Sequence, residues 1–312
     1  MRHFLQSAYW ADFHESLGTK VLRHQSKNGS FVAFLEKSHG KVGKFLTRLY
    51  LPYGPNAESD EQLSALLEEA ETLAREQKAD YIRVEPVGLT LDGAKMNALG
   101  YIKRPKPSQP EQTSVVDIKD KSVDEIVASM NATNRNLWRA NSANTEGLSF
   151  RSSYNPEETA PLIDMMKTTA ERLGLVFHDA SYTKQMVSVL GPLKACGVVY
   201  AVHAGKELAG AQFAVDEESK TLYYLHAGSY FEARTYNAGN LLLTYLILLA
   251  HERGLERVDL FGVAPKDAGK DHPQAGFSSF KRSFGGQDVE YGGTWEKGIN
   301  RIKYTLMTKV RK

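Results

Sequence analysis

Residues 73–86 read LAREQKADYIRVEP, and residues 249–262 read LAHERGLERVDLFG. Each stretch closes a helical pattern with charged residues and then enters an apolar strand, and the two share Leu, Ala and Glu at equivalent places. The copies begin about half a chain length apart, as two copies of one α+β domain would require. The sequence therefore predicts an internal duplication.

The patterns that surround the two copies also agree. Residues 61–77 place leucine and alanine at helical spacing, and residues 239–253 form a second apolar helix that ends at Gly254, a natural C-terminal cap. Three strands are expected before each helix, at 20–23, 30–36 and 45–51 in the first half and at 197–203, 207–216 and 221–228 in the second. We therefore expect an α+β sheet in each half.

A proline-rich segment separates the halves. Residues 103–113 (KRPKPSQPEQT) hold three prolines and no apolar periodicity, which is typical of a linker or an extended crossing. We place the domain boundary near Ser122, with a first domain at 1–121 and a second at 122–292. The C-terminal helix, residues 293–312, is expected to pack back on the first domain.

Composition and charge limit the class of protein. The chain has 312 residues, a formal net charge of +2 and one cysteine, Cys196, so no intramolecular disulfide can form. This is typical of a reducing cytosol. The start lacks the apolar run of a secretory signal, and the apolar run at 241–250 is about half as long as a membrane span requires. We expect a cytoplasmic protein with a buried helix at 241–250.

The usual cofactor and metal motifs are absent from the sequence. It contains no GxxxxGKS/T loop, no glycine-rich dinucleotide turn, no HExxH and no CxxC. It also lacks a Q/RxxGxG/A loop, with which acyl-CoA transferases bind pyrophosphate at a helix start. We therefore expect no cofactor and no metal.

The remaining candidate for chemistry is the cluster GFSSFKRSFGG at 276–286. Phe277, Phe280 and Phe284 follow helical spacing, so we expect them to anchor one helical face. Lys281 and Arg282 flank that face. Two interpretations stay open: a short amphipathic helix with solvated basic residues, or a lysine that presents a fixed positive charge to a developing oxyanion.

These motifs resemble those of the FemABX family, transferases that add amino acids from aminoacyl-tRNA to peptidoglycan precursors. GFSSFKRSFG at 276–285 is similar to the family's GLxxFKxxFG, and VDLFG at 258–262 is similar to its YDFGG strand end. NRNLWRA at 134–140 resembles its basic helix, and LHAGS at 225–229 resembles its LYGAS strand end. The resemblance implies an α+β fold of two tandem acetyltransferase-like (GNAT-like) domains. Because the sequence has no charged heptad run, we expect no coiled-coil arm.

The resemblance also implies site residues. Phe280 and Lys281 occupy the family's FK pair, whose lysine is placed near the reacting carbonyl. Substrate contacts are implied for Trp10, His14, Arg83, Glu85, His178, Tyr182 and His226, of which the three histidines replace the family's more common Lys, Arg and Tyr. Arg135, Arg139 and Arg282 are candidates for tRNA contact, and the basic tail at 301–312 suits either tRNA or anionic lipid.

The implied reaction builds the peptidoglycan interpeptide bridge. The stem-peptide amine attacks the ester of an aminoacyl-tRNA, and the expected acceptor is UDP-MurNAc-pentapeptide or lipid II, in the cytoplasm or at the inner face of the membrane. Two other functions stay open: an N-acyltransferase of the GNAT type with another acyl donor, and a non-catalytic module that binds a cell-wall precursor. The missing pyrophosphate loop counts against the first, and the intact Phe280-Lys281 pair counts against the second.

Overall fold

The computed structural model describes residues 2–38, 45–87, 92–173, 180–269 and 275–310, and the chain divides into two compact units. Unit 1 holds residues 1–111 and 290–312, and unit 2 holds residues 112–289. The division falls before Gln112 rather than near Ser122, because the strand β6 (Gln112–Asp117) pairs with β11 (Arg257–Gly262) in the sheet of unit 2.

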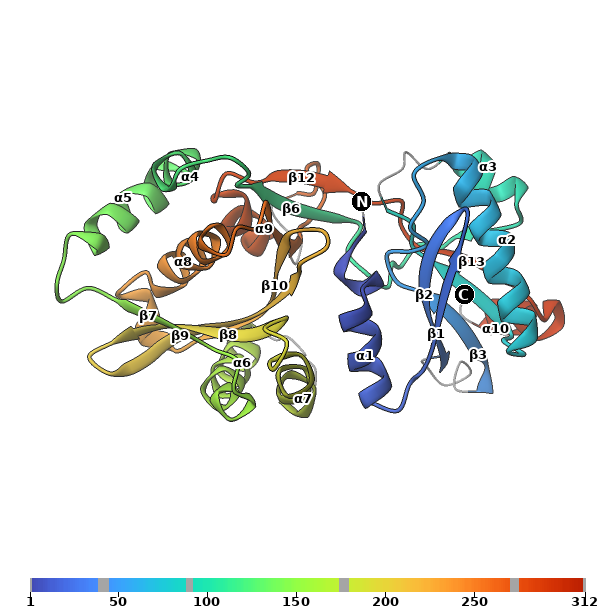
Figure 1. Ribbon diagram of the computed structural model, residues 1–312, viewed down its shortest axis with the longest axis horizontal. Helices are drawn as coiled ribbons and strands as arrows, with labels where there is room; N and C mark the ends of the chain where they lie inside the picture. The colour runs from blue at the N-terminus through green and yellow to red at the C-terminus, as the bar shows by residue number, and fades with distance from the viewer. Residues whose placement is uncertain (1, 39–44, 88–91, 174–179, 270–274, 311–312) are drawn as a thin grey trace. The chain divides into compact units, whose positions relative to one another are not determined.

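Unit 1 is built on a six-stranded sheet with the strand order β1-β2-β3-β4-β13-β5 (Figure 1). The strands are β1 (Lys20–Ser26), β2 (Gly29–Lys37), β3 (Thr47–Leu51), β4 (Tyr81–Val84), β5 (Ile102–Lys103) and β13 (Trp295–Gly298). The helices are η1 (Phe4–Gln6), α1 (Ala8–Ser16), α2 (Asp60–Glu76), α3 (Gly93–Ala98) and α10 (Arg301–Val310). Strand β4 runs parallel to β3, and β13 inserts antiparallel between β4 and β5.

Both faces of the unit 1 sheet are covered, because β2 sends apolar side chains to each face in turn. Phe31 and Ala33 belong to a core cluster with the buried leucines of α2. Val32 and Phe34 instead pack with Ala11 of α1. This alternation is the period of two that a strand imposes on its side chains.

Unit 2 is built on a seven-stranded sheet with the strand order β12-β6-β11-β10-β9-β8-β7. Besides β6 and β11, the strands are β7 (Ser149–Ser153), β8 (Cys196–His203), β9 (Lys206–Asp216), β10 (Thr221–Ser229) and β12 (Gln287–Glu290). The helices are α4 (Val123–Ser129), α5 (Ala132–Ser142), η3 (Pro156–Thr159), α6 (Ala160–Leu173), α7 (Ala180–Leu190), η4 (Phe231–Arg234), α8 (Ala238–Glu252) and α9 (Ala275–Arg282). The longest of these is α8, with 15 residues, so the described part of unit 2 contains no coiled-coil arm.

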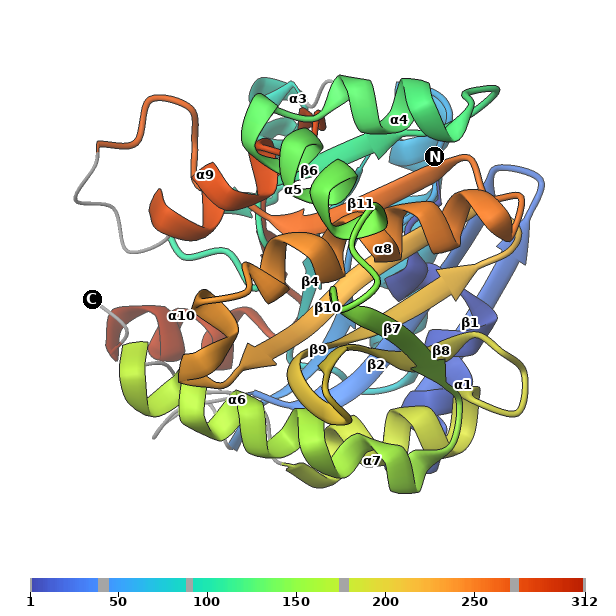
Figure 2. The same cartoon turned by 90° about the vertical axis from the view of Figure 1, so that its left-hand side faces the viewer.

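Helices cover the unit 2 sheet on both faces: α6 and α7 lie on one, and α8 lies on the other with α4 and α5 outside it (Figures 1 and 2). Four buried leucines and Ile247 make α8 the apolar centre of the larger core cluster, which confirms the buried helix predicted at 241–250. Along the described ranges, no helix combines the length and the apolar character needed to cross a bilayer.

The two predicted helix-to-strand repeats are both present. Helix α2 leads through Lys78, at φ 55°, into β4, and helix α8 leads through Gly254, at φ 71°, into β11. In each turn the residue that follows donates its N–H back into the helix, Ala79 to the carbonyl of Ala74 at 2.9 Å and Leu255 to that of Ala250 at 3.1 Å. Strand β4 runs parallel to β3, and β11 runs parallel to β10. The two repeats therefore share the same strand–helix–strand topology.

Gly228 offers a test of the packing between β10 and α6. A Cβ at this position would lie 2.5 Å from backbone atoms of Met165 and Met166, so we expect Gly228→Ala to destabilise unit 2 by about 2–4 kcal/mol. At Gly239 on α8, a Cβ would meet nothing within 4 Å, and Gly239→Ala should stabilise by about 0.5–1 kcal/mol. Urea denaturation followed by circular dichroism measures both, and equal effects of the two changes would contradict the packing.

Candidate active site

Lys281 lies on the last turn of α9 and points to the end of β11. Its Nζ donates a hydrogen bond to the carbonyl oxygen of Gly262 at 2.8 Å. Burial lowers the pKa of Lys281 to about 8, and the negative charge of Asp259 opposes that shift. The side chain is therefore a cation held at a fixed place with a pKa near neutrality, which suits stabilisation of a developing negative charge.

Two neighbours of Lys281 on α9 hold the same backbone segment. Ser278, which is buried, accepts a hydrogen bond from the N–H of Ala264 at 2.7 Å. Arg282 donates to the carbonyl oxygen of Ala264 at 2.6 Å and also forms an ion pair with Asp288 at 2.7 Å. The end of β11 is thus fixed to α9 at three points.

The phenylalanines of the cluster divide between core and solvent. Phe280 and Phe284 meet edge to face with ring centroids 5.1 Å apart, and both belong to the core of unit 2. Phe277 is 40% exposed, so the prediction that all three anchor one helical face is wrong for this residue. Helix α9 ends at Arg282, and Phe284 reaches the core from the turn beyond it. Phe280 therefore anchors α9, the helix that carries Lys281, against the core of unit 2.

The pairing of strand β10 with β11 ends before Gly262, the residue that Lys281 contacts. The two strands pair only from Thr221 to Tyr223 on β10, opposite Arg257 to Asp259 on β11, although both strands continue. His226 lies on β10 beyond its pairing with β11, where it still pairs with Gln212 of β9 just after a register shift, and it is half-buried. Tyr182 is half-buried on α7, and burial raises its pKa.

The three arginines proposed for tRNA contact differ in exposure. Arg135 caps the end of α4, because its guanidinium donates to the carbonyl oxygens of Ala128 at 3.1 Å and Met130 at 3.2 Å. Arg282 is held in the contacts given above. Arg139 is exposed on α5, one helical turn beyond Arg135. Of the three, Arg139 is the one whose charge faces solvent.

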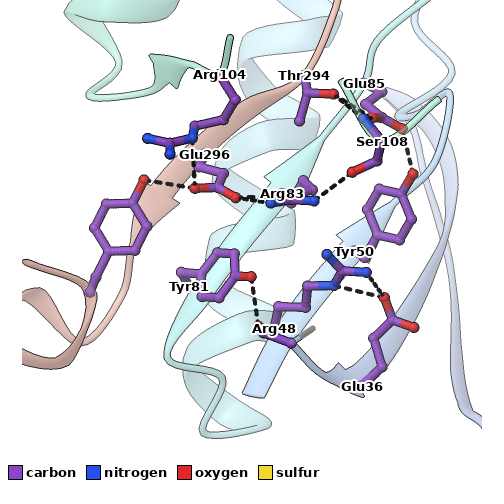
Figure 3. Close-up of polar contacts among 12 residues, drawn as sticks. Glu36, Arg48, Tyr50, Tyr81, Arg83, Glu85, Arg104, Ser108, Thr294 and Glu296 are labelled. Carbon is purple, nitrogen blue, oxygen red and sulfur yellow. Dashed lines mark hydrogen bonds and ion pairs between the residues drawn. The ribbon is translucent and has the colours of Figure 1, made fainter. Parts of the chain in front are cut away.

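Glu85 lies at the centre of a polar network in unit 1 (Figure 3). One carboxylate oxygen accepts hydrogen bonds from Tyr50 at 2.6 Å, and the other accepts from the N–H groups of Ser108 and Gln109 and from the hydroxyl of Thr294. The side chain is buried. Glu85 thus ties the crossing segment after β5 to the sheet, and a direct contact with substrate would have to displace one of these bonds.

Arg83 belongs to the same network and is also paired. It forms an ion pair with Glu296 of β13, which is fully buried, and it donates to the hydroxyl of Ser108 at 2.5 Å (Figure 3). Glu296 further accepts from Tyr304 of α10 at 3.0 Å and lies 3.4 Å from Arg104. Arg83 and Glu85 therefore meet through Ser108, and both hold the C-terminal segment and the crossing in place.

Trp10 and His14 lie together on α1, one turn apart. Their ring centroids are 4.7 Å apart, and the His14 ring also lies 4.5 Å from that of Phe34. Both ring nitrogens of His14 are buried, with no hydrogen-bond partner among the described residues. Burial lowers the pKa of His14 to about 4, so the ring is neutral at pH 7 and carries no charge for a phosphate.

One predicted site residue cannot be placed, and two residues beside Lys281 were not predicted from the sequence. His178 lies outside the described residues. Asp259 and Thr113, which are hydrogen-bonded to each other, received no role in the sequence analysis, although Asp259 stands within the VDLFG stretch. Within the described ranges, no three His, Cys, Asp or Glu side chains are grouped so that they could hold a metal ion.

Comparison with known proteins gives a family match over the C-terminal third of the chain and a fold over nearly all of it. The FemAB family model matches residues 202–312. The fold is similar to that of FemX, with a TM-score of 0.83 and 20% identity over 97% of this chain and 94% of that chain. It is also similar to the C-terminal domain (DUF2156) of a putative lysylphosphatidylglycerol synthetase from Agrobacterium fabrum, with a TM-score of 0.60 and 14% identity over 97% and 91% of the chains. L-PGS from Bacillus licheniformis gives a TM-score of 0.58 and 14% identity over 95% and 94%. No curated protein matches the sequence.

The matched segment contains β10, α8, β11 and α9, and with them Lys281 and Gly262. The FemAB match thus falls on the segment whose motifs resemble that family, and the similarity to FemX confirms the predicted α+β fold of two tandem domains.

The ion pair of Arg83 predicts a large loss of stability when the arginine is removed. Arg83→Met leaves the fully buried carboxylate of Glu296 with weaker compensation, so we expect unit 1 to lose about 3–5 kcal/mol. Lys95→Met, which breaks an exposed pair with Asp60, should leave the unfolding midpoint nearly unchanged. Urea unfolding followed by tryptophan fluorescence measures both. Equal midpoints for Arg83→Met and the wild type would mean that Arg83 does not hold the unit together.

The neutral state of His14 predicts an acid-sensitive unit 1. Its pKa is about 4 in the folded chain and about 6.5 in the unfolded chain, so the unfolded chain binds more protons between these values. The free energy of unfolding should therefore fall as the pH is lowered from 6.5 to 4, and His14→Phe should remove about 2–3 kcal/mol of that fall. The measurement is urea unfolding at pH 7, 5.5 and 4.5. The same pH dependence in both proteins would show that His14 is protonated when folded.

Proposed function

We propose that the protein transfers an amino acid from aminoacyl-tRNA to the stem-peptide amine of a peptidoglycan precursor, and so forms an interpeptide bridge. One observation supports this most: the family motif at 276–285 places Lys281 as a fixed, partly buried cation at the end of β11. The family match over residues 202–312 includes this whole arrangement.

The chemistry needs what Lys281 offers. The acceptor amine attacks the ester carbonyl of the aminoacyl-tRNA, a C–N bond forms, and the C–O bond to the ribose breaks as the amine proton passes to the ribose oxygen. The carbonyl oxygen is negatively charged in the tetrahedral intermediate, and an ammonium group held close to it stabilises that charge. Of the three N–H donors of Lys281, one goes to Gly262, which orients the others.

Substrate contacts in unit 2 are proposed for residues around the separation of β10 and β11. His226 lies on β10 beyond its pairing with β11, and Tyr182 lies half-buried on α7. Arg139, which is exposed, is the arginine that we propose for a phosphate of the tRNA, since phosphate contacts supply most of the affinity for nucleic acid.

In unit 1, the acceptor contacts proposed from the motifs need a modified role. Arg83 and Glu85 are paired internally, and His14 is neutral, so we propose that these residues shape the acceptor side through Tyr50, Ser108 and Gln109 rather than by free charge. Trp10, half-buried at the surface of α1, is the member of the set with a ring available for contact.

Replacement of Lys281 tests the proposal. Lys281→Met should lower the rate of transfer at least about 100-fold, because the oxyanion loses its cation. In the wild type, the rate should fall as the pH rises through about 8, since Lys281 is active as the ammonium form and loses its proton there. The assay follows radiolabel from a pool of charged tRNAs to UDP-MurNAc-pentapeptide and to lipid II, with acetyl-CoA as a parallel donor.

Two controls make the result specific. Lys184→Met changes an exposed lysine on α7 that pairs with Glu157, and it should transfer at the wild-type rate. Turnover of acetyl-CoA without transfer from tRNA would contradict the proposed donor while leaving the fold assignment intact. Transfer by Lys281→Met at the wild-type rate would remove Lys281 from the mechanism.

A further inference from the structure

The end of β11 contains a bulge that the sheet alone does not explain. Val115 of β6 lies opposite Asp259, and Thr113, two residues earlier on β6, lies opposite Gly262. Between these two pairs β11 therefore contains one residue more than β6. Phe261, inside the bulge, has a φ of 62°, a conformation that costs a side chain about 1 kcal/mol or more. A local interaction must therefore hold this backbone.

Asp259 supplies that interaction. Its Oδ1 accepts a hydrogen bond from the N–H of Phe261 at 2.7 Å and another from the hydroxyl of Thr113. Asp259 and Thr113 are both buried, 3% and 2% exposed. Beyond the bulge, Val263 donates to the carbonyl oxygen of Gln112 at 2.9 Å, so the chain returns to the ladder. The carboxylate thus bridges β6 to the strained residue of β11.

The bulge determines where the carbonyl group of Gly262 lies, and this oxygen is the one that Lys281 contacts. The path from Asp259 to Lys281 is short: carboxylate to the N–H of Phe261, then through one residue to the Gly262 oxygen, then 2.8 Å to Nζ. The same carboxylate also raises the pKa of Lys281 against the effect of burial. One side chain therefore acts on both the place and the charge of the lysine.

We infer that Asp259 is a positioning residue for Lys281: its carboxylate, held by Thr113, fixes the Phe261 bulge so that the Gly262 carbonyl holds the ammonium group toward the reacting ester. The inference rests on the proposed function for the role of Lys281 in transfer. It adds a pair, Asp259 and Thr113, that acts through the backbone and does not touch substrate.

The charged groups that face Lys281 are few among the described residues. Asp259 on β11 is the one that changes its pKa. On its own helix, Arg282 is neutralised by its ion pair with Asp288. On β10, the facing residue is Tyr223, opposite Asp259. Loss of the Asp259 charge should therefore leave Lys281 easier to deprotonate.

Two substitutions separate the effect of the Asp259 charge from the effect of the hydrogen bond that fixes its carboxylate. Asp259→Asn keeps an oxygen for Phe261 but removes the charge, and we expect the titration midpoint of Lys281 to fall by about half to one pH unit. Thr113→Val keeps the charge but releases the carboxylate, and kcat should fall about 10- to 100-fold with KM nearly unchanged, while Thr113→Ser, which keeps the hydroxyl, should retain the wild-type kcat. The titration is read from the ¹³Cε resonance of Lys281 in protein labelled at lysine, assigned with Lys281→Met.

The titration needs no substrate, so it stands apart from the proposed function. An unchanged Lys281 midpoint in Asp259→Asn, with unchanged kcat in Thr113→Val, would overturn the inference. Absence of transfer by the wild type would overturn the proposed function, whereas a shifted midpoint in Asp259→Asn would still support the coupling of the two residues. Asp117→Asn, an exposed change on β6, is the matched control and should leave the midpoint in place. Circular dichroism checks that each variant is folded. If Asp259→Asn does not fold, the comparison of kcat between Thr113→Val and Thr113→Ser tests the inference instead.

Discussion

Lys281 meets the carbonyl oxygen of Gly262 because β11 leaves regular strand geometry after Asp259. The place of the Lys281 ammonium group in unit 2 follows from this bend. Strand β10 loses its pairing with β11 at the same level, and α9 anchors the segment beyond the bend through Ser278 and Arg282. A regular strand would present its carbonyl groups to its neighbours in the sheet, and none would be left for the lysine.

The duplicated strand ends show two uses of one position. In the aligned repeats Arg83 of β4 corresponds to Asp259 of β11, and each binds a residue from the antiparallel strand beside it. Arg83 pairs with Glu296 of β13, which closes the edge of unit 1 with a buried ion pair. Asp259 binds Thr113 of β6 and bends the strand. Arg83 in unit 1 thus stabilises the fold, whereas Asp259 in unit 2 shapes the backbone of the candidate active site.

The sequence was sufficient for the elements and for the resemblance to the family whose model matches residues 202–312, since helix α8 and the strand after it are local patterns and the FK motif is contiguous. It was not sufficient for the environment of single residues. The partners of Arg83 and Asp259 lie 213 and 146 residues away in the chain, and no local pattern shows such contacts. His14 follows the family motif by position, but Phe34, from the next structural layer, makes its surroundings apolar and its ring neutral. Phe277 has helical spacing, yet α9 turns it to solvent.

Chemical rescue shows whether a cation at the position of the Lys281 Nζ promotes transfer. Lys281→Ala removes the side chain beyond Cβ, and ethylammonium is smaller than the part removed. We expect transfer from aminoacyl-tRNA to be lost in this variant and to return in proportion to the concentration of ethylammonium, while uncharged ethanol has no effect. Transfer by Lys281→Ala at the wild-type rate without added amine would mean that the reaction does not use this cation.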